Sequence, residues 1–471
     1  MSSPLFMLAA FLACQFISLT RVAWIGWLGG DVGPLAAGAN VLSVIFAGGL
    51  AAAYLRREGL QLSGFGKSLL IMLGAWVGVM LVVGLLHGWM LREIAIDFAA
   101  WLILLAFLIA GASDAFWDDL RKVAPYFLFA GVLVCALSLR EIYQLADLAI
   151  SGERIARDLS AYRLVWVLYL FPIMLLLANP QKPSQYFLAS LAAVLALELQ
   201  IIFQKRMETL FICALFVLVI WRLFLALRSG KLFRAEGPIR ILVVSGFLLV
   251  AASLLAGILV PKVLGTQAQM LVGRFSTLTE SPTNLPSAEI IDGEASLQGA
   301  KVEIEGRWNE RWWIVMNSLR EFGAVDWVFG RGFGGYVAFS HPVIDLYMSR
   351  DDRSQLLAAY IMQETGAIGR RQTEIGFVMP LIKGGFPAQI LFVITLLYAF
   401  SRKVNSDWLG HACKIFLALY VVRYLNGGAF ILSDAVQFAV FCAALGRCMR
   451  EQRPAYSGLN PSSHTCTQLR S

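Results

Sequence analysis

Long apolar runs, separated by short polar stretches, make up most of the chain. Many of them reach the ~20 residues that a helix needs to cross a bilayer. The ten-residue alternation of a transmembrane barrel strand is absent from the sequence. The pattern therefore predicts an all-α polytopic membrane protein with about twelve spanning helices. The predicted spans are residues 4–20, 35–55, 67–87, 93–112, 122–139, 162–179, 184–203, 207–227, 238–260, 375–400, 408–427 and 429–447.

One long hydrophilic stretch, residues 262–374, interrupts this pattern. Residues 1–261 before it hold the first nine predicted helices, and residues 375–449 after it hold the last three. The polar tail, residues 450–471, is rich in Ser and Pro and is expected to be disordered. The chain is therefore expected to carry one large loop outside the membrane.

The sequence predicts three different kinds of structure within this loop. Residues 275–305 are acidic and rich in Ser, Thr, Pro and Gly, which is typical of irregular structure. Residues 307–322 have apolar side chains at helical spacing, and residues 343–366 are a second helical candidate. Between them, Gly330–Gly335 predicts a tight glycine turn. The simplest architecture is two helices that cap a cavity on the outer face.

Composition agrees with a membrane protein and gives its expected orientation. The chain is 58% hydrophobic and 15% charged, whereas a soluble protein is about 25% charged. Lys and Arg collect in cytoplasmic loops, and they are more frequent in the loops that lie inside if the N-terminus is cytoplasmic. We therefore expect both termini to be cytoplasmic and the large loop to lie outside. The net charge of +8 is explained by this topology rather than by nucleic-acid binding.

Cysteine and histidine give no framework for a disulfide or a metal. Five of the seven cysteines lie in apolar runs and the large loop contains none. The four histidines are scattered, and no His/Cys metal spacing occurs. No metal and no cofactor are expected.

Charged residues within predicted spans mark functional sites by default, because they are costly in a bilayer. Nearly all of them fall in the outer halves of their helices. They are Asp97, Arg163, Glu198, Lys205, Arg206, Lys383, Arg423 and Asp434. One interpretation is helix-fixing ion pairs, such as Lys383 with Asp434 or Glu198. The other is an outward-opening cationic cavity, which would suit an anionic, membrane-borne ligand such as a phosphate.

Several motifs carry a resemblance to a known family. The loop contains Arg311-Trp-Trp-Ile-Val-Met-Asn-Ser-Leu-Arg-Glu and then Gly330-Arg-Gly-Phe-Gly-Gly. Glu374-Ile-Gly-Phe-Val-Met-Pro-Leu-Ile-Lys-Gly-Gly follows the loop, and Phe203-Gln-Lys-Arg-Met-Glu lies between the seventh and eighth spans. With Arg163 opening the sixth span, this arrangement resembles the bacterial O-antigen polymerase and O-antigen ligase superfamily, membrane glycosyltransferases of the GT-C type.

The resemblance implies an activity and a set of site residues. The donor would be a glycan on undecaprenyl pyrophosphate in the bacterial inner membrane, used on the periplasmic face, and a chain-length regulator is a possible partner. Fixed cations would stabilise the pyrophosphate leaving group, and a general base would deprotonate the acceptor hydroxyl. The implied catalytic residues are Glu374, His341 and Arg331. The implied substrate-binding residues are Arg163, Lys205, Arg206, Arg311, Lys383 and Arg423.

Polymerase is the leading interpretation within this superfamily. Ligases typically carry a His-Asn pair just before the tenth span, where this chain has Gln372-Thr373-Glu374. An O-antigen ligase or protein O-oligosaccharyltransferase remains the first alternative. A lipid-linked glycan transporter is the second, although transporters favour repeated halves with charges near the midplane.

Overall fold

The computed structural model describes two regions of the chain, one towards each end, and part of the loop between them. The described residues are 3–19, 33–137, 188, 192, 315, 319, 322–335, 337–338, 369–370, 376–403, 408–426 and 435–451. The long helices are α1 (Pro4–Leu19), α3 (Gly33–Glu58), α4 (Gly64–Leu86), α5 (Leu91–Gly111), α6 (Asp114–Leu137), α17 (Met379–Ser401), α18 (Trp408–Asn426) and α19 (Ala435–Cys448). The short elements are α14 (Ala324–Phe329), β1 (Val337–Ala338), β2 (Gly369–Arg370) and the 3-10 turn η1 (Gly376–Val378).

Four helical segments are long and apolar enough to cross a membrane. They are Ala37–Glu58, Gly64–Leu86, Leu91–Gly111 and Gly376–Ser401. Each coincides with a predicted span, which confirms the expectation of apolar membrane-type helices in these parts of the chain. The predicted spans at 162–179, 184–203, 207–227 and 238–260 lie outside the described residues, apart from Leu188 and Ala192.

The described structure departs from an all-helical fold at one small ladder. Val337 of β1 pairs with Arg370 of β2, and Ala338 pairs with Gly369, in antiparallel register. The ladder pairs residues just after the glycine turn at 330–335 with residues shortly before η1. The two ends of the segment between the turn and η1 therefore lie side by side.

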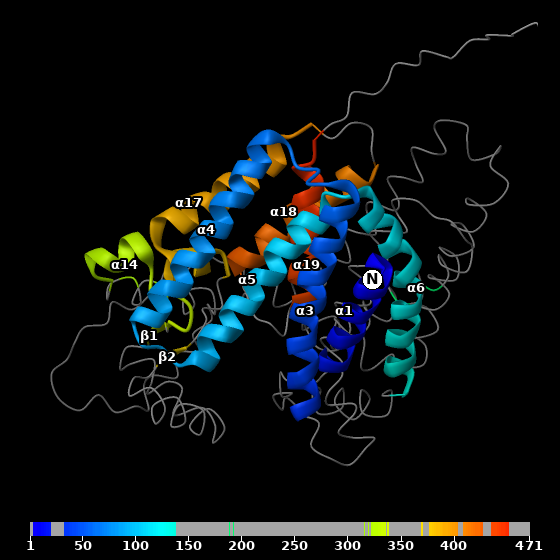
Figure 1. Cartoon of the computed structure of the whole chain (residues 1–471), viewed down its shortest axis with the longest axis horizontal. Coiled ribbons are helices and arrows are strands. Elements are labelled where there is room, and N and C mark those ends of the chain that lie inside the picture. The colour runs from blue at the N-terminus through cyan, green and yellow to red at the C-terminus, as the bar shows by residue number, and fades with distance from the viewer. Residues whose placement is uncertain are drawn as a thin grey trace, which may run out of the picture.

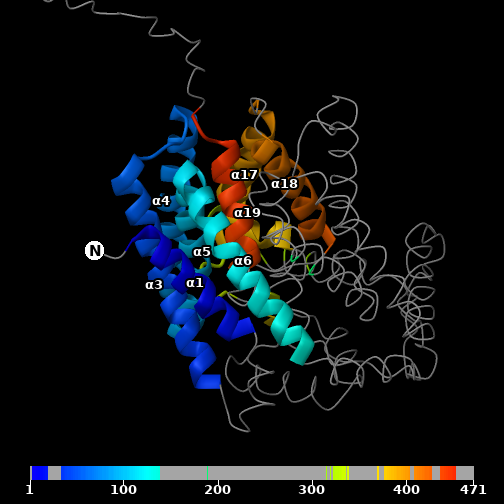
Figure 2. The same cartoon turned by 90° about the vertical axis from the view of Figure 1, so that its right-hand side faces the viewer.

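Helices from the two ends of the sequence pack into one bundle (Figures 1 and 2). Helix α5 lies between α3 and α19, while α17 packs along α4. Small residues bring α5 and α19 into close contact: a Cβ on Gly111 would lie 2.2 Å from the Ala443 oxygen. Likewise, a Cβ on Gly446 would lie 2.1 Å from the Leu108 oxygen. Close backbone approach through small residues is how helices associate in membranes, where lipid supplies no hydrophobic drive.

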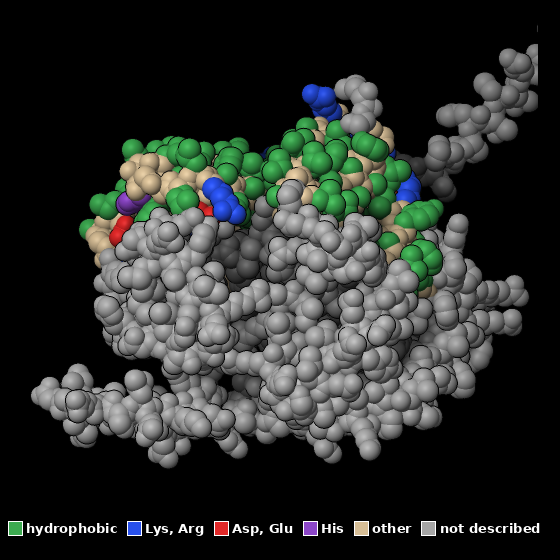
Figure 3. Space-filling view, turned by 90° about the horizontal axis from the view of Figure 1, so that it is seen from below, with side chains coloured by type: hydrophobic (Ala, Val, Ile, Leu, Met, Phe, Trp, Pro, Cys, Tyr) green, Lys and Arg blue, Asp and Glu red, His purple; other side chains and the backbone are tan. Residues whose placement is uncertain are grey.

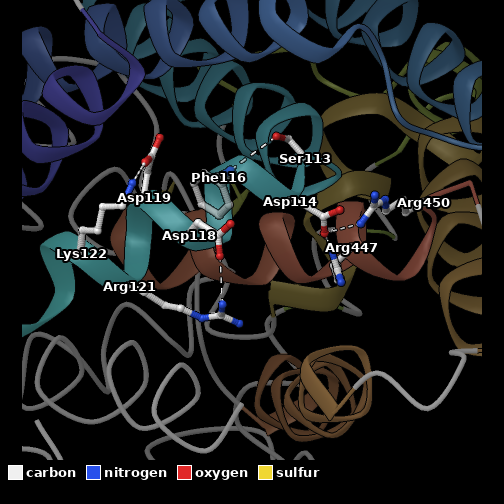
Figure 4. A network of polar contacts seen from close by, with 9 residues as sticks. All are labelled: Ser113, Asp114, Phe116, Asp118, Asp119, Arg121, Lys122, Arg447 and Arg450. Atoms are coloured by element: carbon white, nitrogen blue, oxygen red, sulfur yellow. Dashed lines mark hydrogen bonds and ion pairs between the residues drawn. The ribbon is translucent and has the colours of Figure 1, made fainter. Parts of the chain in front are cut away.

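Helix α6 begins at Asp114, earlier than the predicted span at 122–139. Its first turns are charged rather than apolar, so hydropathy alone does not reveal them. Local ion pairs hold them in helical form: Arg121 bonds Asp118 at 2.9 Å and Lys122 bonds Asp119 at 3.0 Å, each pair three residues apart (Figure 4).

The C-terminal end of α19 joins this charged region. Asp114 accepts hydrogen bonds from both Arg447 and Arg450 (Figure 4). Burial opposes ionisation of Asp114, but the bonds and charges of the two arginines hold the pKa of its carboxyl below the usual value. The backbone of Met449 also accepts the Ser63 N–H at 3.1 Å. The loops that the sequence predicts to be cytoplasmic therefore meet at one end of the bundle.

Candidate functional site

The first turns of α17 are bent, and the bend creates a place for another segment. Gly385 has φ +68°, a conformation that L side chains rarely adopt, and Pro387 follows it inside the helix. A Cβ on Gly385 would lie 2.4 Å from the Val328 oxygen of α14. The sequence Lys383-Gly-Gly therefore bends α17 and lets the loop segment pack directly against its backbone.

The segment that fills this place is the predicted glycine turn, Gly330–Gly335. Gly330, Gly332 and Gly334 all have positive φ, between +71° and +80°, and the N–H of Gly335 bonds the Gly332 oxygen at 3.3 Å. The prediction of a tight glycine turn is therefore confirmed. Because it ends α14 and enters the bundle, it connects the loop to the candidate membrane spans.

Hydrogen bonds fix the first half of the turn to α17. The N–H of Arg331 bonds the Ile382 oxygen at 2.9 Å, and the N–H of Gly332 bonds the Lys383 oxygen at 2.9 Å. The indole N–H of Trp89 donates to the Arg331 oxygen at 2.8 Å. Both backbone polar groups of Arg331 are thus held, one by α17 and the other by the loop between α4 and α5.

The second half of the turn is fixed to α4 and α5. The N–H of Phe333 bonds the Met80 oxygen of α4 at 3.0 Å, and the phenyl ring is fully buried beside Trp101. A Cβ on Gly84 would lie 2.3 Å from the Phe333 oxygen, so α4 must carry glycine there. The turn therefore packs between three candidate spans, α4, α5 and α17.

A buried ion pair between Lys383 and Asp97 completes the site. The Lys383 ammonium lies 2.6 Å from Asp97 Oδ2 and 2.6 Å from the Gly335 oxygen. The same carboxylate oxygen accepts the Gly334 N–H at 2.9 Å. Lys383 is 2% exposed and Asp97 5%. A buried pair is stable only when further hydrogen bonds complete it, and here the turn supplies two of them.

The structure describes a partner of Lys383 that the sequence did not suggest, Asp97. Asp97 lies on α5, whereas Asp434 and Glu198 lie outside the described residues, so pairing of Lys383 with either stays a prediction. In the described structure the ammonium of Lys383 holds the turn in place. A direct contact between Lys383 and a substrate phosphate stays a prediction.

Arg331 is the cationic residue of the glycine turn. Its side chain is half-buried, and its guanidinium carbon lies 5.1 Å from the centre of the Phe322 ring. Phe322 in turn packs edge-on against Trp327 at 5.3 Å. A cation over an aromatic face gains about 0.5–1 kcal/mol at an exposed site. The backbone bonds and this contact together restrict where the charge can lie.

The other predicted site residues are not brought into this geometry by the described structure. Arg423 lies in α18, without a described side chain. The remaining ones fall outside the described residues: Arg163, Lys205, Arg206, Arg311, His341 and Glu374. Their roles stay predictions. Within the described part of the chain, no group of three or more His, Cys, Asp or Glu side chains could hold a metal ion.

Sequence reasoning did not identify three residues that build the site. Trp89 and Trp76 donate their indole N–H groups to the turn and to the Gly384 oxygen, the latter at 2.7 Å. Gly84 provides the space for Phe333. Trp89 lies just past the end of α4, where a tryptophan ordinarily indicates an interfacial anchor, and Trp76 lies in the middle of α4. No sequence signal therefore marks either one as a hydrogen-bond donor to a distant segment.

The arrangement fixes the backbone of a cationic residue, Arg331, between the candidate spans α4, α5 and α17. Comparison with known proteins adds no family: no family model matches the chain, and no curated protein matches it significantly.

Proposed function

We propose that the chain is a membrane glycosyltransferase that polymerises undecaprenyl-pyrophosphate-linked oligosaccharide units into a surface polysaccharide. In this proposal about twelve helices span a bacterial inner membrane in a GT-C-like arrangement. Both termini are cytoplasmic, and the large loop is periplasmic. The described helices support the membrane part, since four of them are long and apolar enough to span.

The observation that carries the proposal is the fixed position of Arg331. A glycosyl transfer from a lipid pyrophosphate develops negative charge on the leaving group as the anomeric carbon–oxygen bond breaks. A cation lowers that barrier only if it is already in place. The hydrogen bonds from Arg331 to Ile382 and from Trp89 to Arg331 fix the backbone of this residue, and the contact with Phe322 restricts its guanidinium.

The proposed reaction needs one more group. The acceptor hydroxyl oxygen attacks the anomeric carbon, and undecaprenyl pyrophosphate leaves with the electron pair of the broken bond. The hydroxyl proton passes to a general base, for which Glu374 and His341 are the candidates. Arg163, Lys205 and Arg206 would complete the pyrophosphate site together with Arg331. Arg is suited to this role because its planar fork bonds two phosphate oxygens at once.

Complementation of a deletion strain tests the proposal. The strain carries the wild type, Arg331→Ala, Arg331→Lys or the control Arg92→Ala, which removes an exposed arginine from the start of α5. Membrane levels are matched, and the surface glycan is separated on a gel. We expect Arg331→Ala to collapse the ladder to single repeat units, Arg331→Lys to shorten it, and Arg92→Ala to leave it unchanged.

Two other outcomes would contradict the proposal and indicate a different function. Long lipid-linked polymer that fails to reach its acceptor would indicate a ligase. Lipid-linked repeat units that accumulate on the cytoplasmic face would indicate a transporter.

A further inference from the structure

The depth of the glycine turn in the bundle is set by its contacts with α4. The Trp76 ring stacks on Phe329 of α14, with centroids 6.4 Å apart and an interplanar angle of 9°. Trp76 precedes the end of α4 at Leu86 by about 15 Å along the axis, at 1.5 Å per residue. Phe329, at the end of α14, therefore lies beside the middle of a candidate span, at a level that hydrocarbon would surround.

Irregular backbone survives at such depth only if its polar groups are satisfied within the protein. Every N–H of the glycine turn meets this condition. Gly330 bonds the Asp326 oxygen at 2.8 Å, and Arg331 to Gly335 donate to the partners described above. The carbonyls of Arg331, Gly332 and Gly335 also accept bonds. This pattern is more complete than a loop in water requires, since water would satisfy the same groups.

The outer surface of this segment is apolar. Val325 is 64% exposed, Val328 47% and Phe329 41%, and the neighbouring Phe386 of α17 is 50% exposed. They continue a larger apolar surface on α4 and α17. Its other exposed members include Ile71, Met72, Val82, Ile390 and Leu397. In the view of Figure 3 most described side chains are hydrophobic and charged ones are scattered.

The polar side chain of α14 has a partner within the protein, which lowers the cost of insertion. Asp326 is the helix's ionisable residue, and its carboxylate accepts the Gly323 N–H at 3.1 Å. The large aromatic Trp327 stacks on Phe386 with centroids 5.0 Å apart. An exposed apolar patch that continues the flanks of two candidate spans fits the same surroundings as those flanks.

We propose that residues 322–335 re-enter the membrane rather than lie in the aqueous loop, and that Val325, Val328, Phe329 and Phe386 contact lipid acyl chains. This goes beyond the proposed function, since it concerns where the segment lies and holds whatever reaction the protein performs. It would place part of residues 262–374, which the sequence predicts to lie outside the membrane, within the bilayer.

Spin labels test the location. Single cysteines replace Val325, Val328 or Phe386 in a background without native cysteines, and the labelled protein is reconstituted into phosphatidylcholine vesicles. Val82→Cys on α4 is the lipid control and Lys122→Cys on α6 the aqueous control; both positions are exposed. Power saturation then compares collisions with O₂, which concentrates in lipid, and with a water-soluble nickel chelate.

We expect at least two of the three loop labels to match Val82→Cys, with high O₂ and low nickel accessibility. Nickel accessibility like that of Lys122→Cys would overturn the proposal, since the segment would then lie in water. Labels shielded from both reagents would also overturn it, because another protein surface, such as a second copy, would then cover the patch. Neither result depends on whether the vesicles show glycosyl transfer.

Discussion

The ammonium of Lys383 and the carboxylate of Asp97 lie 2.6 Å apart, although 286 residues separate them in the sequence. Each is buried in a candidate span, α17 or α5. Both also bond the glycine turn between them, at Gly335 and Gly334. One ion pair therefore joins the two parts of the chain that flank the large loop, and it holds part of the loop in place.

Removing one partner of this pair should destabilise the protein strongly. Lys383→Met leaves the Asp97 carboxylate buried without the ammonium, which costs about 3–5 kcal/mol in comparable buried pairs. The double variant Lys383→Met/Asp97→Asn should recover much of the loss, because an amide oxygen can still accept the Gly334 N–H. The measurement is the midpoint of thermal unfolding in detergent, read by gel filtration after heating.

The control for that series is Asp118→Asn. Asp118 is exposed and pairs with Arg121 on the surface of α6, and such pairs contribute about 0–1 kcal/mol. If Lys383→Met unfolds at the same temperature as Asp118→Asn, the pair does not hold the turn.

Two glycines of α4 should respond differently to replacement by alanine. Gly84→Ala places a methyl group 2.3 Å from the Phe333 oxygen, so the turn must move. No atom lies within 4 Å of the place that a Cβ on Gly78 would take, and alanine is a better helix former there by about 1 kcal/mol. We expect Gly84→Ala to lower the unfolding midpoint and the polymer yield, and Gly78→Ala to preserve both. Equal behaviour of the two variants would show that the turn does not pack on α4.

Acid should weaken the contact between α6 and the end of α19. The pKa of Asp114 lies below its unfolded value of about 3.9, so the ionised carboxylate stabilises the fold above that pH. The contribution is lost as pH falls through the folded-state pKa. The unfolding midpoint of the wild type should exceed that of Asp114→Asn at neutral pH, and the difference should shrink below about pH 4. A difference that stays constant with pH would mean that the charge of Asp114 does not contribute to stability.

Hydropathy was sufficient to locate the described spans, because a helix in lipid must satisfy its own backbone and be apolar over its whole length. It located α4 and α5 within a few residues of their observed bounds. It missed the start of α6, where Asp114 and Asp118 bond arginines. The charged first turns are stable through those contacts, which a hydropathy average does not represent.

The glycine turn was predicted from its composition, but its location was not. Positive φ at Gly330 and Gly332 follows from the lack of a Cβ. Its insertion between α4, α5 and α17 depends on Gly84, Gly385 and the Lys383–Asp97 pair, which are far apart in the sequence. Intramembrane charge indicated that Asp97 needed a partner, but only the packing of α5 against the turn and α17 selects Lys383.

The most direct test of the account uses purified protein in liposomes with a synthetic undecaprenyl-pyrophosphate-linked repeat unit. Chain length and release of undecaprenyl pyrophosphate are measured for the wild type and Arg331→Ala. The hydrogen bonds that fix the turn at Arg331 come from its backbone, so the variant keeps them; its unfolding midpoint is measured alongside the rate. We predict polymer of many units from the wild type and a rate lower by about 10²–10³ for Arg331→Ala, the cost of losing one fixed charge-stabilising donor. Wild-type protein that makes no polymer, or an Arg331→Ala variant that polymerises at the wild-type rate, would contradict the account.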